Sequence, residues 1–410
     1  MASRRDGKGR VLRKGETLRK DGRYAYSYRD PNGNRRYIYA RNLVDLRQKE
    51  EQLIRDQMDG LDVYVAGKAT VNMVFDRYMS TKTNLRSTTF TNYQYMWNHF
   101  VKDSFGKKKI GDVKYSDVLQ FYTYLMNEKG IQINSLETIN TLIHPTFQLA
   151  VKDDIIRKNP SKGVYREVKE RLGGRKKVRH ALSIEEQREF IDYIKNNPVY
   201  DVWYPFFTVM LGTGCRIGEI TALTWDDVDF KNRVIYIKRS LTYYTRHDKD
   251  GTCEYRIDSP KTDAGIREIP LMGPVYEVLL DEYQRQSEEG FNEVEVDGVT
   301  NLIFVNRFGG PHNHGGVNRA IKRIVDAHNS EEVVKAKKEK REAIIIPRIS
   351  SHILRHTFCS RFCENETNIK VIQTVMGHAD ISTTMDIYAE VNRETTRQSL
   401  ENLAKNLDVF

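Results

Sequence analysis

One short segment near the end of the sequence carries side chains that could bind an oxyanion and move a proton beside it. Residues 350–357 read SSHILRHT, and either serine could cap a helix that begins at His352. His352 and Arg355 are three positions apart, so a helix aims both at one point. A guanidinium grips an oxyanion and an imidazole transfers a proton, which predicts oxyanion chemistry for this helix.

Four more positions could contribute to the same chemistry. Arg216 follows Gly214, and the glycine allows a sharp turn that leaves the guanidinium near the start of a helix. Lys261 lies in a Pro/Gly turn between two predicted strands, a mobile position suited to delivering one proton. His378 adds a hydrogen-bond donor. A tyrosine hydroxyl ordinarily has a pKa of about 10 and must lose its proton as it attacks, so Tyr388 is a candidate nucleophile.

A metal site is the rival chemistry for this region. Four possible ligands follow one another at helical spacing: His352, His356, Cys359 and Cys363. A single helix presents two ligands to one ion far more readily than four, and buried cysteines are most often small core residues. We therefore expect no metal and no other cofactor. We also expect structural roles for His356, which helical geometry turns away from Arg355, and for Glu219 in an ion pair or a helix.

The bulk composition sets broad limits on the class of protein. A chain of 410 residues is too long for one ordinary core, so two or three domains are expected. Its 39% hydrophobic and 30% charged residues are typical of a soluble globular protein. The longest apolar run, residues 202–215, is too short and too interrupted to span a membrane. No secretory segment follows the start, and four scattered cysteines fit a reducing compartment, so a cytoplasmic protein is expected.

Most of the positive charge lies at the beginning of the chain. The net charge is +10, and residues 1–41 hold 13 Lys/Arg against 4 Asp/Glu, a net of +9. Residues 23–29 alternate as a strand, a turn follows at 30–33, residues 35–41 form a second strand, and a polar helix covers about 43–58. A small sheet with a helix behind it could contact DNA with arginine and tyrosine side chains, although a plain surface hairpin would look similar. The candidate contacts are Arg23, Tyr24, Tyr26, Arg35 and Arg36.

The middle of the chain is predicted to be helical. Helices fit residues 88–103, 115–129 and 135–152, after a first helix that begins near Thr70. Lys107 and Lys108 are the phosphate contacts expected in this part, although a charge run is usually a solvated loop. Residues 165–180 are interpreted as a basic inter-domain linker, with Arg175, Lys176 and Lys177 as further candidate DNA contacts.

A mixed region follows from residue 181. Strands are expected at 233–241, near 254–257 and at 266–271, and helices at 273–288 and 316–328. Residues 202–211 are a buried helix or strand, and residues 331–342 are so highly charged that a loop or an exposed helix is expected. The whole chain is thus predicted to be multidomain α+β: a small N-terminal β-sheet-plus-helix domain, an all-helical domain, and a mainly α domain with a small antiparallel sheet.

Taken together, the candidate residues resemble the signature of the tyrosine recombinase (integrase) family. The matching segments are TGCRIGE around Arg216, PKT at Lys261, HILRHT at His352 and Arg355, MGH at His378 and DIYA at Tyr388. The RKDGRY stretch at residues 19–24 is most similar to integrases of conjugative transposons and related phages. The resemblance implies an arm-type DNA-binding domain (1–65), a helical core-binding domain (66–164), the basic linker (165–180), a catalytic domain (181–392) and a tail (393–410) that packs on a neighbouring subunit.

The resemblance also implies a mechanism that the residue chemistry supports. Two arginines, Arg216 and Arg355, offer paired N–H groups to a phosphodiester, and His378 adds a donor. Tyr388 becomes linked to a 3′-phosphate, with His352 assisting its deprotonation and Lys261 protonating the leaving 5′-oxygen. The linkage conserves the bond energy, so neither ATP nor a metal is needed.

On this reading the protein integrates and excises a mobile element. Four protomers would act on two DNA duplexes through a Holliday junction, at arm-type and core-type sites, and an excision factor or a host DNA-bending protein is a further candidate partner. Bound to DNA, the protein would be nucleoid-associated. Two alternatives use the same scaffold: a DNA-binding protein without catalytic activity, and a topoisomerase-like enzyme that relaxes supercoils without exchanging partners.

Overall fold

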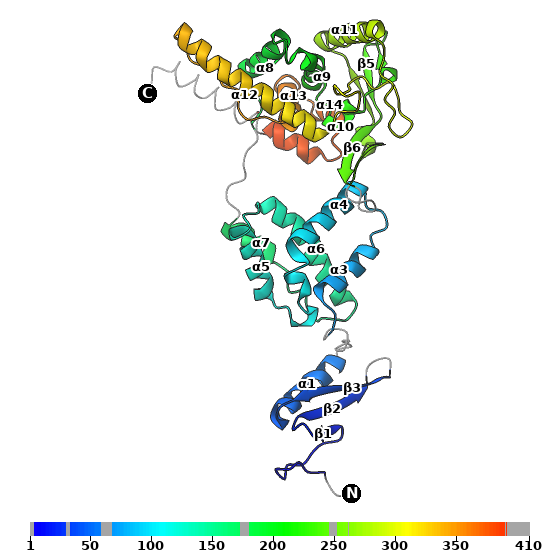
Figure 1. Ribbon diagram of the computed structural model, residues 1–410, viewed down its shortest axis with the longest axis vertical. Helices are drawn as coiled ribbons and strands as arrows, with labels where there is room; N and C mark the ends of the chain where they lie inside the picture. Colours follow the sequence, from blue (N-terminus) through cyan, green and yellow to red (C-terminus); the bar gives the residue numbers. More distant parts are fainter. Residues whose placement is uncertain are drawn as a thin grey trace. The chain divides into compact units, whose positions relative to one another are not determined.

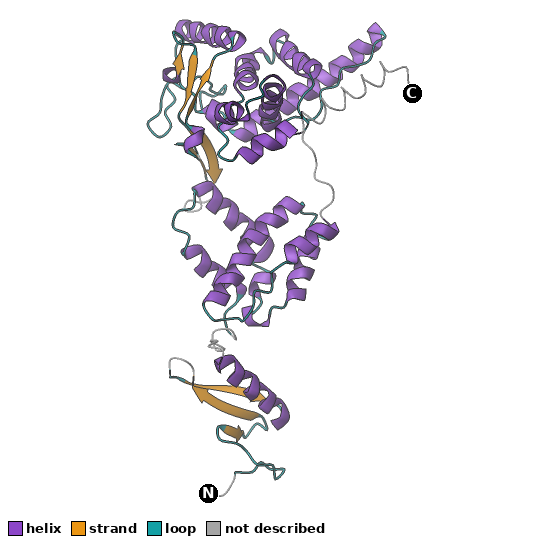
Figure 2. Ribbon diagram, turned by 180° about the vertical axis from the view of Figure 1, so that it is seen from behind, coloured by secondary structure: helices purple, strands orange, loops and turns teal. Residues whose placement is uncertain are grey.

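The structure of the chain is a computed structural model (Figure 1). It describes residues 4–29, 33–58, 68–172, 180–245, 252–260, 262–389 and 391. The chain divides into two units, residues 1–176 and 177–410. Helices predominate, and the described strands form three small antiparallel sheets (Figure 2).

The first unit begins with a three-stranded sheet covered by one helix. Strands β1 (Glu16–Leu18), β2 (Tyr24–Arg29) and β3 (Arg35–Ala40) pair in that order, and helix α1 (Leu43–Met58) follows. Alternation along the strands explains the cover, because one face of the sheet buries its side chains against the Leu43 and Leu46 side chains of α1. The two predicted strands and the helix are confirmed. Strand β1 was not predicted, because it lies in the basic stretch at the start of the chain, where Glu16 is one of few acidic residues. Glu16 is buried, and Arg47 of α1 forms an ion pair with it at 2.9 Å.

A bundle of helices forms the rest of the first unit. The α-helices have these bounds: α3 (Val71–Ser80), α4 (Ser87–Met96), α5 (Tyr115–Asn127), α6 (Ile133–Lys152) and α7 (Val164–Leu172). A π-helical turn (Trp97–Val101) continues α4, and short 3-10 helices lie at Phe105–Lys107 and Ile110–Asp112. The rings of Phe75 and Trp97 stack at the centre of the core, 3.6 Å between centroids. The predicted helices are confirmed here.

The predicted linker differs from the structure in its first half. Residues 164–172 are helix α7, and Val164 and Val168, one helical turn apart, are fully buried in the core of the bundle. The sequence interpretation failed because charged residues surround these two valines and mask their helical spacing. The second half of the predicted linker, with Arg175, Lys176 and Lys177, lies outside the described residues.

The second unit packs helices around an apolar core beside two small sheets. Its α-helices are α8 (Ile184–Asn196), α9 (Tyr204–Thr213), α10 (Ile217–Thr221), α11 (Gly273–Glu289), α12 (His314–Glu339), α13 (Ser351–Asn365) and α14 (Ile369–Met376). Short 3-10 helices lie at Asp201–Trp203, Trp225–Asp227 and Asp263–Gly265. Helix α9 is buried almost throughout, so the buried segment predicted at 202–211 is a helix. Of the two forms expected for the charged residues 331–342, a loop or an exposed helix, most of the stretch takes the helix, because α12 continues to Glu339.

The strands of the second unit form a sheet and a separate hairpin. Strands β4 (Val228–Asp229), β5 (Val234–Ile237) and β8 (Arg267–Pro270) form the sheet, whereas β6 (Ser240–Thr245) pairs only with β7 (Cys253–Asp258). The single strand predicted at 233–241 is therefore two strands that belong to different sheets. With this detail corrected, the predicted multidomain α+β fold is confirmed.

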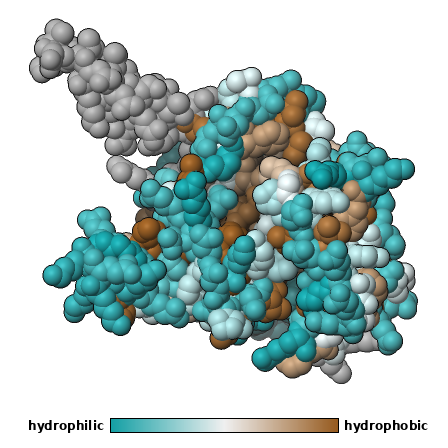
Figure 3. Space-filling model, turned by 90° about the horizontal axis from the view of Figure 1, so that it is seen from above, coloured by the Kyte–Doolittle hydropathy of each residue, from teal (hydrophilic) through white to brown (hydrophobic). Residues whose placement is uncertain are grey.

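Hydrophilic residues cover most of the surface seen from above in Figure 3, and apolar residues are confined to smaller patches between them. Polar and charged groups therefore dominate what a partner would meet on this side. Within the described part of the chain, no helix is both long and apolar enough to cross a membrane.

Candidate active site

Arg216 is held at the start of helix α10 by a turn that needs glycine. Gly214 ends α9 in the left-handed region (φ 62°), and a Cβ there would collide with the ring of Phe358 in α13. Arg216 comes two residues later as the N-cap of α10, and its side chain is 43% exposed. Its Nη1 donates to Glu219 Oε1 at 2.8 Å and its Nη2 to the Gly377 carbonyl at 2.9 Å. These two bonds engage only part of its five N–H groups, so donors remain for a ligand.

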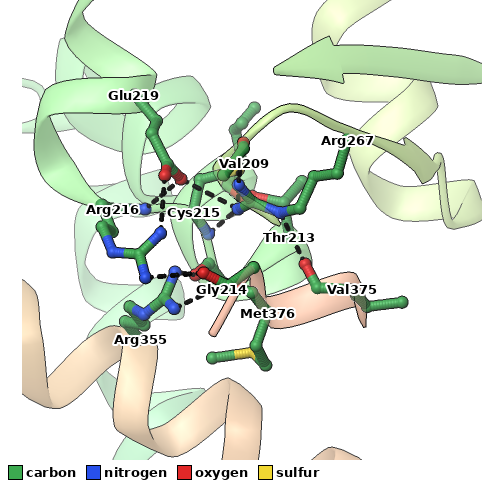
Figure 4. A network of polar contacts seen from close by, with 12 residues as sticks. Val209, Thr213, Gly214, Cys215, Arg216, Glu219, Arg267, Arg355, Val375 and Met376 are labelled. Carbon is green, nitrogen blue, oxygen red and sulfur yellow. Dashed lines mark hydrogen bonds and ion pairs between the residues drawn. The ribbon is translucent and has the colours of Figure 1, made fainter. Parts of the chain in front are cut away.

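Arg355 approaches the same point from helix α13 but is almost fully buried, with 5% of its surface exposed. Its Nη1 donates to the Gly214 carbonyl at 2.7 Å and its Nη2 to the Met376 carbonyl at 2.6 Å. Figure 4 shows the guanidinium groups of Arg216 and Arg355 side by side. Burial, and then the charge of Arg216, lower the pKa of Arg355 to about 10, so it remains charged at neutral pH.

Glu219 is the carboxylate that balances this cluster. It is 2% exposed and accepts from Arg216 and, through Oε2, from Arg267 Nη2 at 2.8 Å. Burial opposes its ionisation, but the hydrogen bond and charge of Arg267 and the charge of Arg216 outweigh burial and lower the pKa of Glu219. The network of Figure 4 contains three guanidinium groups and this one carboxylate, which accepts from Arg216 and Arg267, so the network carries net positive charge.

His378 follows directly after the turn that binds both arginines. Gly377 ends α14 in the left-handed region (φ 64°), and His378 behind it is buried, with its Nδ1 2.9 Å from the Thr384 hydroxyl. Burial, and then the charges of Arg355 and Arg216, lower the pKa of His378 to about 4. A neutral imidazole donates from one nitrogen only, so a Thr384 hydroxyl that donates to Nδ1 leaves Nε2–H free to donate to an oxyanion.

Tyr388 lies on a helical segment, residues 381–389. Asp380 precedes this segment, and its carboxylate accepts a hydrogen bond from the Ser382 amide at 2.9 Å. Its half-buried ring packs in an apolar cluster built from α13 and α14 that includes Cys359 and Met376. Because the Met376 carbonyl binds Arg355, this cluster places the tyrosine segment beside the arginine-bearing turn. His352 is exposed on α13, one turn before Arg355, and its charge contributes to the low pKa of His378.

The structure thus brings together Arg216, Arg355, His378 and the Tyr388 segment, with His352 nearby. Lys261 lies outside the described residues, between strand β7 and the 3-10 helix that precedes β8. Glu219 forms ion pairs with Arg216 and Arg267, which is the kind of structural role that the sequence suggested for it.

Arg267 belongs to this cluster and was not predicted. It is buried on β8, in phase with the buried Ile269, and it ion-pairs with Glu219. A charged residue that takes an inward position in a strand of alternating pattern was the signal that could have found it.

The structure of the N-terminal sheet contradicts one of the predicted DNA contacts. Tyr24 is 5% exposed, faces α1 and bonds through its hydroxyl to Asp6 at 2.8 Å, so its assignment as a DNA contact is wrong. Tyr26 and Arg36 share that covered face by alternation. The alternation along the strand correctly predicts that Tyr24 and Tyr26 share one face of the sheet. It does not predict which face the helix covers.

The open face of the same sheet carries a different set of aromatic and basic side chains. Tyr37 and Tyr39 are 47% and 40% exposed, with ring centroids 6.4 Å apart. Arg35 lies over the ring of Tyr37 at 5.7 Å, and Arg19 and Arg23 lie over Tyr39 at 5.1 and 5.8 Å. Arg23 and Arg35 are therefore accessible from this face, as a DNA contact requires.

In the helical bundle, both lysines that were singled out have acidic partners. Lys107 is exposed and lies 3.1 Å from Asp103, and Lys108 donates to Asp117 at 2.7 Å, which lowers the pKa of Asp117. Among the residues that the structure describes, no group of three or more His, Cys, Asp or Glu side chains is arranged to hold a metal ion.

Comparison with known proteins identifies the class. The family model of the phage integrase family matches residues 180–395, the DNA-binding domain of Tn916 integrase matches residues 1–57, and the phage integrase SAM-like domain matches residues 70–169. The chain belongs to the phage integrase family and is a tyrosine-type site-specific recombinase.

Three of the similar proteins are transposases or integrases of transposons, and a fourth is lambda integrase. The transposase of transposon Tn1545 from Streptococcus pneumoniae is 30% identical over 98% of this chain and 97% of its own length, and that of Tn916 from Enterococcus faecalis is 29% identical over the same shares. The Tn1549 integrase in complex with a circular intermediate DNA is 28% identical, covers 82% of this chain and 99% of its own, and has a TM-score of 0.69. A lambda integrase tetramer bound to a Holliday junction shares the fold, at 16% identity over 91% of this chain and 94% of its own, with a TM-score of 0.53.

Proposed function

We propose that the chain is the integrase of a conjugative transposon, a site-specific recombinase that cuts and rejoins DNA strands to integrate and excise the element. The observation that carries this function is the meeting of Arg216 and Arg355 around one turn, with His378 directly behind it. The net positive charge of that network suits a phosphodiester, whose negative charge rises in the transition state. The Tn1549 integrase structures, complexes with circular intermediate DNA and with transposon right end DNA, support DNA as the substrate.

Each residue of the site has one role in the proposed reaction. Arg216 and Arg355 donate to the non-bridging phosphate oxygens, and neutral His378 donates to the same oxygens. The Tyr388 oxygen attacks the phosphorus while its proton passes to His352. The bond from phosphorus to the 5′-oxygen breaks, and Lys261 supplies the proton that lets this oxygen leave as a hydroxyl.

Rejoining runs the same steps backwards. A 5′-hydroxyl of the partner strand attacks the 3′-phosphotyrosine, and Tyr388 leaves and recovers its proton. The covalent intermediate keeps the energy of the broken phosphodiester, which is why the exchange proceeds without ATP.

The DNA-binding roles divide between the parts of the chain. We assign arm-type sites to residues 1–65 through the open sheet face, because Arg23, Arg35 and the two exposed tyrosines gather there and residues 1–57 match a DNA-binding domain. Core-type sites fall to the helical domain, which α7 extends beyond the predicted 66–164 to residue 172 and which includes Lys107 and Lys108, and to the catalytic domain (181–392). Arg175, Lys176 and Lys177 complete the proposed contacts from a linker shortened by α7.

Recombination needs two duplexes, so we propose a homotetramer that acts through a Holliday junction. The lambda integrase tetramer on such a junction supports this assembly through its shared fold. Residues 393–410 are proposed to pack on a neighbouring subunit, and an excision factor or host DNA-bending protein to set the direction. The cytoplasmic, nucleoid-associated location expected from the sequence stays a prediction.

The decisive test is capture of the covalent intermediate. The wild-type protein is incubated with a nicked suicide substrate taken from the ends of its element, from which the cleaved strand diffuses away. We expect a protein–DNA adduct that survives denaturation, and its loss in Tyr388→Phe with unchanged DNA binding. Tyr283→Phe, which alters an exposed tyrosine of α11, is the matched control and should form the adduct normally. An adduct that persists in Tyr388→Phe would refute the nucleophile, and relaxation of supercoils without recombination would favour a topoisomerase.

A further inference from the structure

Arg267 is a buried arginine that joins segments lying far apart in the sequence. It begins strand β8, just after the segment that contains Lys261, and its side chain is 3% exposed. Burying a guanidinium is costly unless its N–H groups are satisfied, so its partners indicate what it holds in place.

The guanidinium of Arg267 donates to three separate segments. Its Nε donates to the Val375 carbonyl at 2.7 Å, at the end of α14 before His378. Its Nη1 donates to the Gly265 carbonyl at 3.0 Å, in the 3-10 helix that follows Lys261. Its Nη2 donates to Glu219 at 2.8 Å and lies 3.7 Å from the Cys215 sulfur, on the two sides of Arg216. Figure 4 shows these contacts converging on one side chain.

These partners leave Arg267 little capacity to bind a substrate. Four of the five N–H groups of Arg267 have a partner within the protein. The described hydrogen bonds of the Arg355 side chain engage two N–H groups, and those of the Arg216 side chain also engage two. Burial raises the pKa of the Cys215 thiol to about 11, so the sulfur beside Arg267 is neutral. The negative charge of Glu219 is therefore paired with Arg267 at Oε2 and with Arg216 at Oε1.

Close packing ties the same guanidinium to the turn that carries His378. A Cβ on Gly377 would lie 2.9 Å from Arg267 Nη1 and 3.0 Å from the Ala264 carbonyl, so this turn rests directly on the arginine and on the 3-10 helix. The Gly377 carbonyl in turn accepts from Arg216. A shift of Arg267 therefore displaces Arg216, the Lys261 segment and His378 together.

We propose that Arg267 is a positioning residue that fixes the Arg216 turn, the segment after Lys261 and the turn before His378 relative to one another. It acts through these groups and does not touch the DNA. The inference rests on the proposed recombinase function, because it concerns how that site is preorganised. Misplacing catalytic groups by about 1 Å lowers a rate by as much as about 10²-fold, whereas an ion pair that only adds stability leaves the rate of the folded enzyme unchanged.

The test compares cleavage chemistry with folding and DNA binding. Arg267→Gln removes the charge and most of the donors, and Arg267→Lys keeps a charge beside Glu219 but cannot reach all three segments. The matched control is Arg341→Gln, which breaks the ion pair of Arg341 with the buried Glu332 of α12, away from the three segments. The full-length proteins are assayed at saturating concentration on the suicide substrate, together with half-site affinity and thermal unfolding.

We expect Arg267→Gln to cleave about 10²-fold more slowly than the wild type, Arg267→Lys to recover part of the rate, and both to bind the half-site within about threefold of the wild-type affinity. Arg341→Gln should lose stability but keep the wild-type cleavage rate. The pH profile supplies a second readout, because the charge of Arg267 helps to keep His378 neutral, and its loss in Arg267→Gln should move the acid limb of cleavage to higher pH.

The outcomes separate this proposal from the proposed function. A wild-type protein that forms no adduct refutes both. A wild-type adduct together with a folded Arg267→Gln variant that cleaves at the wild-type rate refutes the positioning role alone. Failure of both Arg267 variants to fold, while Arg341→Gln folds, also refutes it, because Arg267 would then be a residue of stability.

Discussion

Two histidines of the second unit are held neutral by their surroundings. His378 lies behind the arginine-bearing turn, and His312 lies against Trp203 and Phe206, 4.8 and 5.6 Å between ring centroids. Burial lowers the pKa of each to about 4, and Arg355 contributes further at His378. An unfolded chain restores a value near 6.5, so between these values the unfolded state binds more protons than the folded one.

This difference predicts a loss of stability in mild acid. The contribution of each neutral histidine is fully present above about pH 6.5 and is lost progressively as the pH falls toward about 4. At pH 5 the loss is up to about 2 kcal/mol for each histidine. Chemical denaturation at pH 7.5 and pH 5 should therefore show a smaller pH effect in His378→Gln and in His312→Gln, and the smallest in the double variant. The exposed His314→Gln is the control, and a double variant as acid-sensitive as the wild type would contradict the assignment.

At the scale of elements, the close contact of helix α10 with strand β6 links the Arg216 helix to the hairpin. Gly218 makes this contact possible, because a Cβ there would lie 2.5 Å from Ser240 Oγ and 2.8 Å from the Leu241 carbonyl. The Leu241 carbonyl belongs to the backbone and cannot rotate away. The hairpin leads on through β7 to the Lys261 segment, so the spacing set by Gly218 also bears on the proposed acid.

We expect Gly218→Ala to destabilise the second unit by about 1–3 kcal/mol, since the strand must move to admit one methyl group. Gly273→Ala is the matched control: it also lies in a helix, at the start of α11, and its added methyl meets no atom within 4 Å. The midpoint of chemical unfolding measures both variants. Equal midpoints would show that the contact adapts without cost.

The elements also show why some features could be predicted from the sequence and others could not. Helical spacing and caps located α3 to α6 and α13, because each buries a periodic stripe or begins at a capping residue such as Thr70. Period-two alternation paired Tyr24 with Tyr26 but could not tell which face of the sheet a helix would cover. Helix α7 was missed because its many charged residues mask a short apolar pattern. Arg267 was missed because its buried position depends on partners that lie far away in the sequence.

The candidate site followed the same division. Arg216, Arg355, His378 and Tyr388 stood out because their types, order and spacing resemble one family, although each alone is an ordinary residue. The hydrogen bonds of the two arginines could not be predicted, because they go to the backbone carbonyls of Gly214, Met376 and Gly377. Every residue has a backbone carbonyl, so the sequence does not indicate which ones accept.

At the scale of the whole molecule, the charge and the candidate chemistry lie in different parts of the chain. Residues 1–41 hold a net charge of +9 out of +10, whereas the arginine network lies between residues 214 and 378. Phosphate contacts give DNA affinity that falls with salt, by a slope of about 0.9 for each phosphate neutralised. The N-terminal sheet should therefore govern affinity for arm-type DNA without governing the chemistry at the core site.

In the full-length protein, Arg35→Ala should weaken binding to an arm-type duplex and reduce the salt slope by about 0.9, because one phosphate contact of the open sheet face is lost. Adduct formation on an isolated core-site substrate should be unchanged, since Arg35 lies outside the unit that carries the site. Lys49→Gln is the matched control: it also removes one positive charge, but from α1, which covers the other face of the sheet. Equal salt slopes for the wild type, Arg35→Ala and Lys49→Gln would show that DNA does not lie on the open face, whereas a larger effect of Lys49→Gln would place it against the helix.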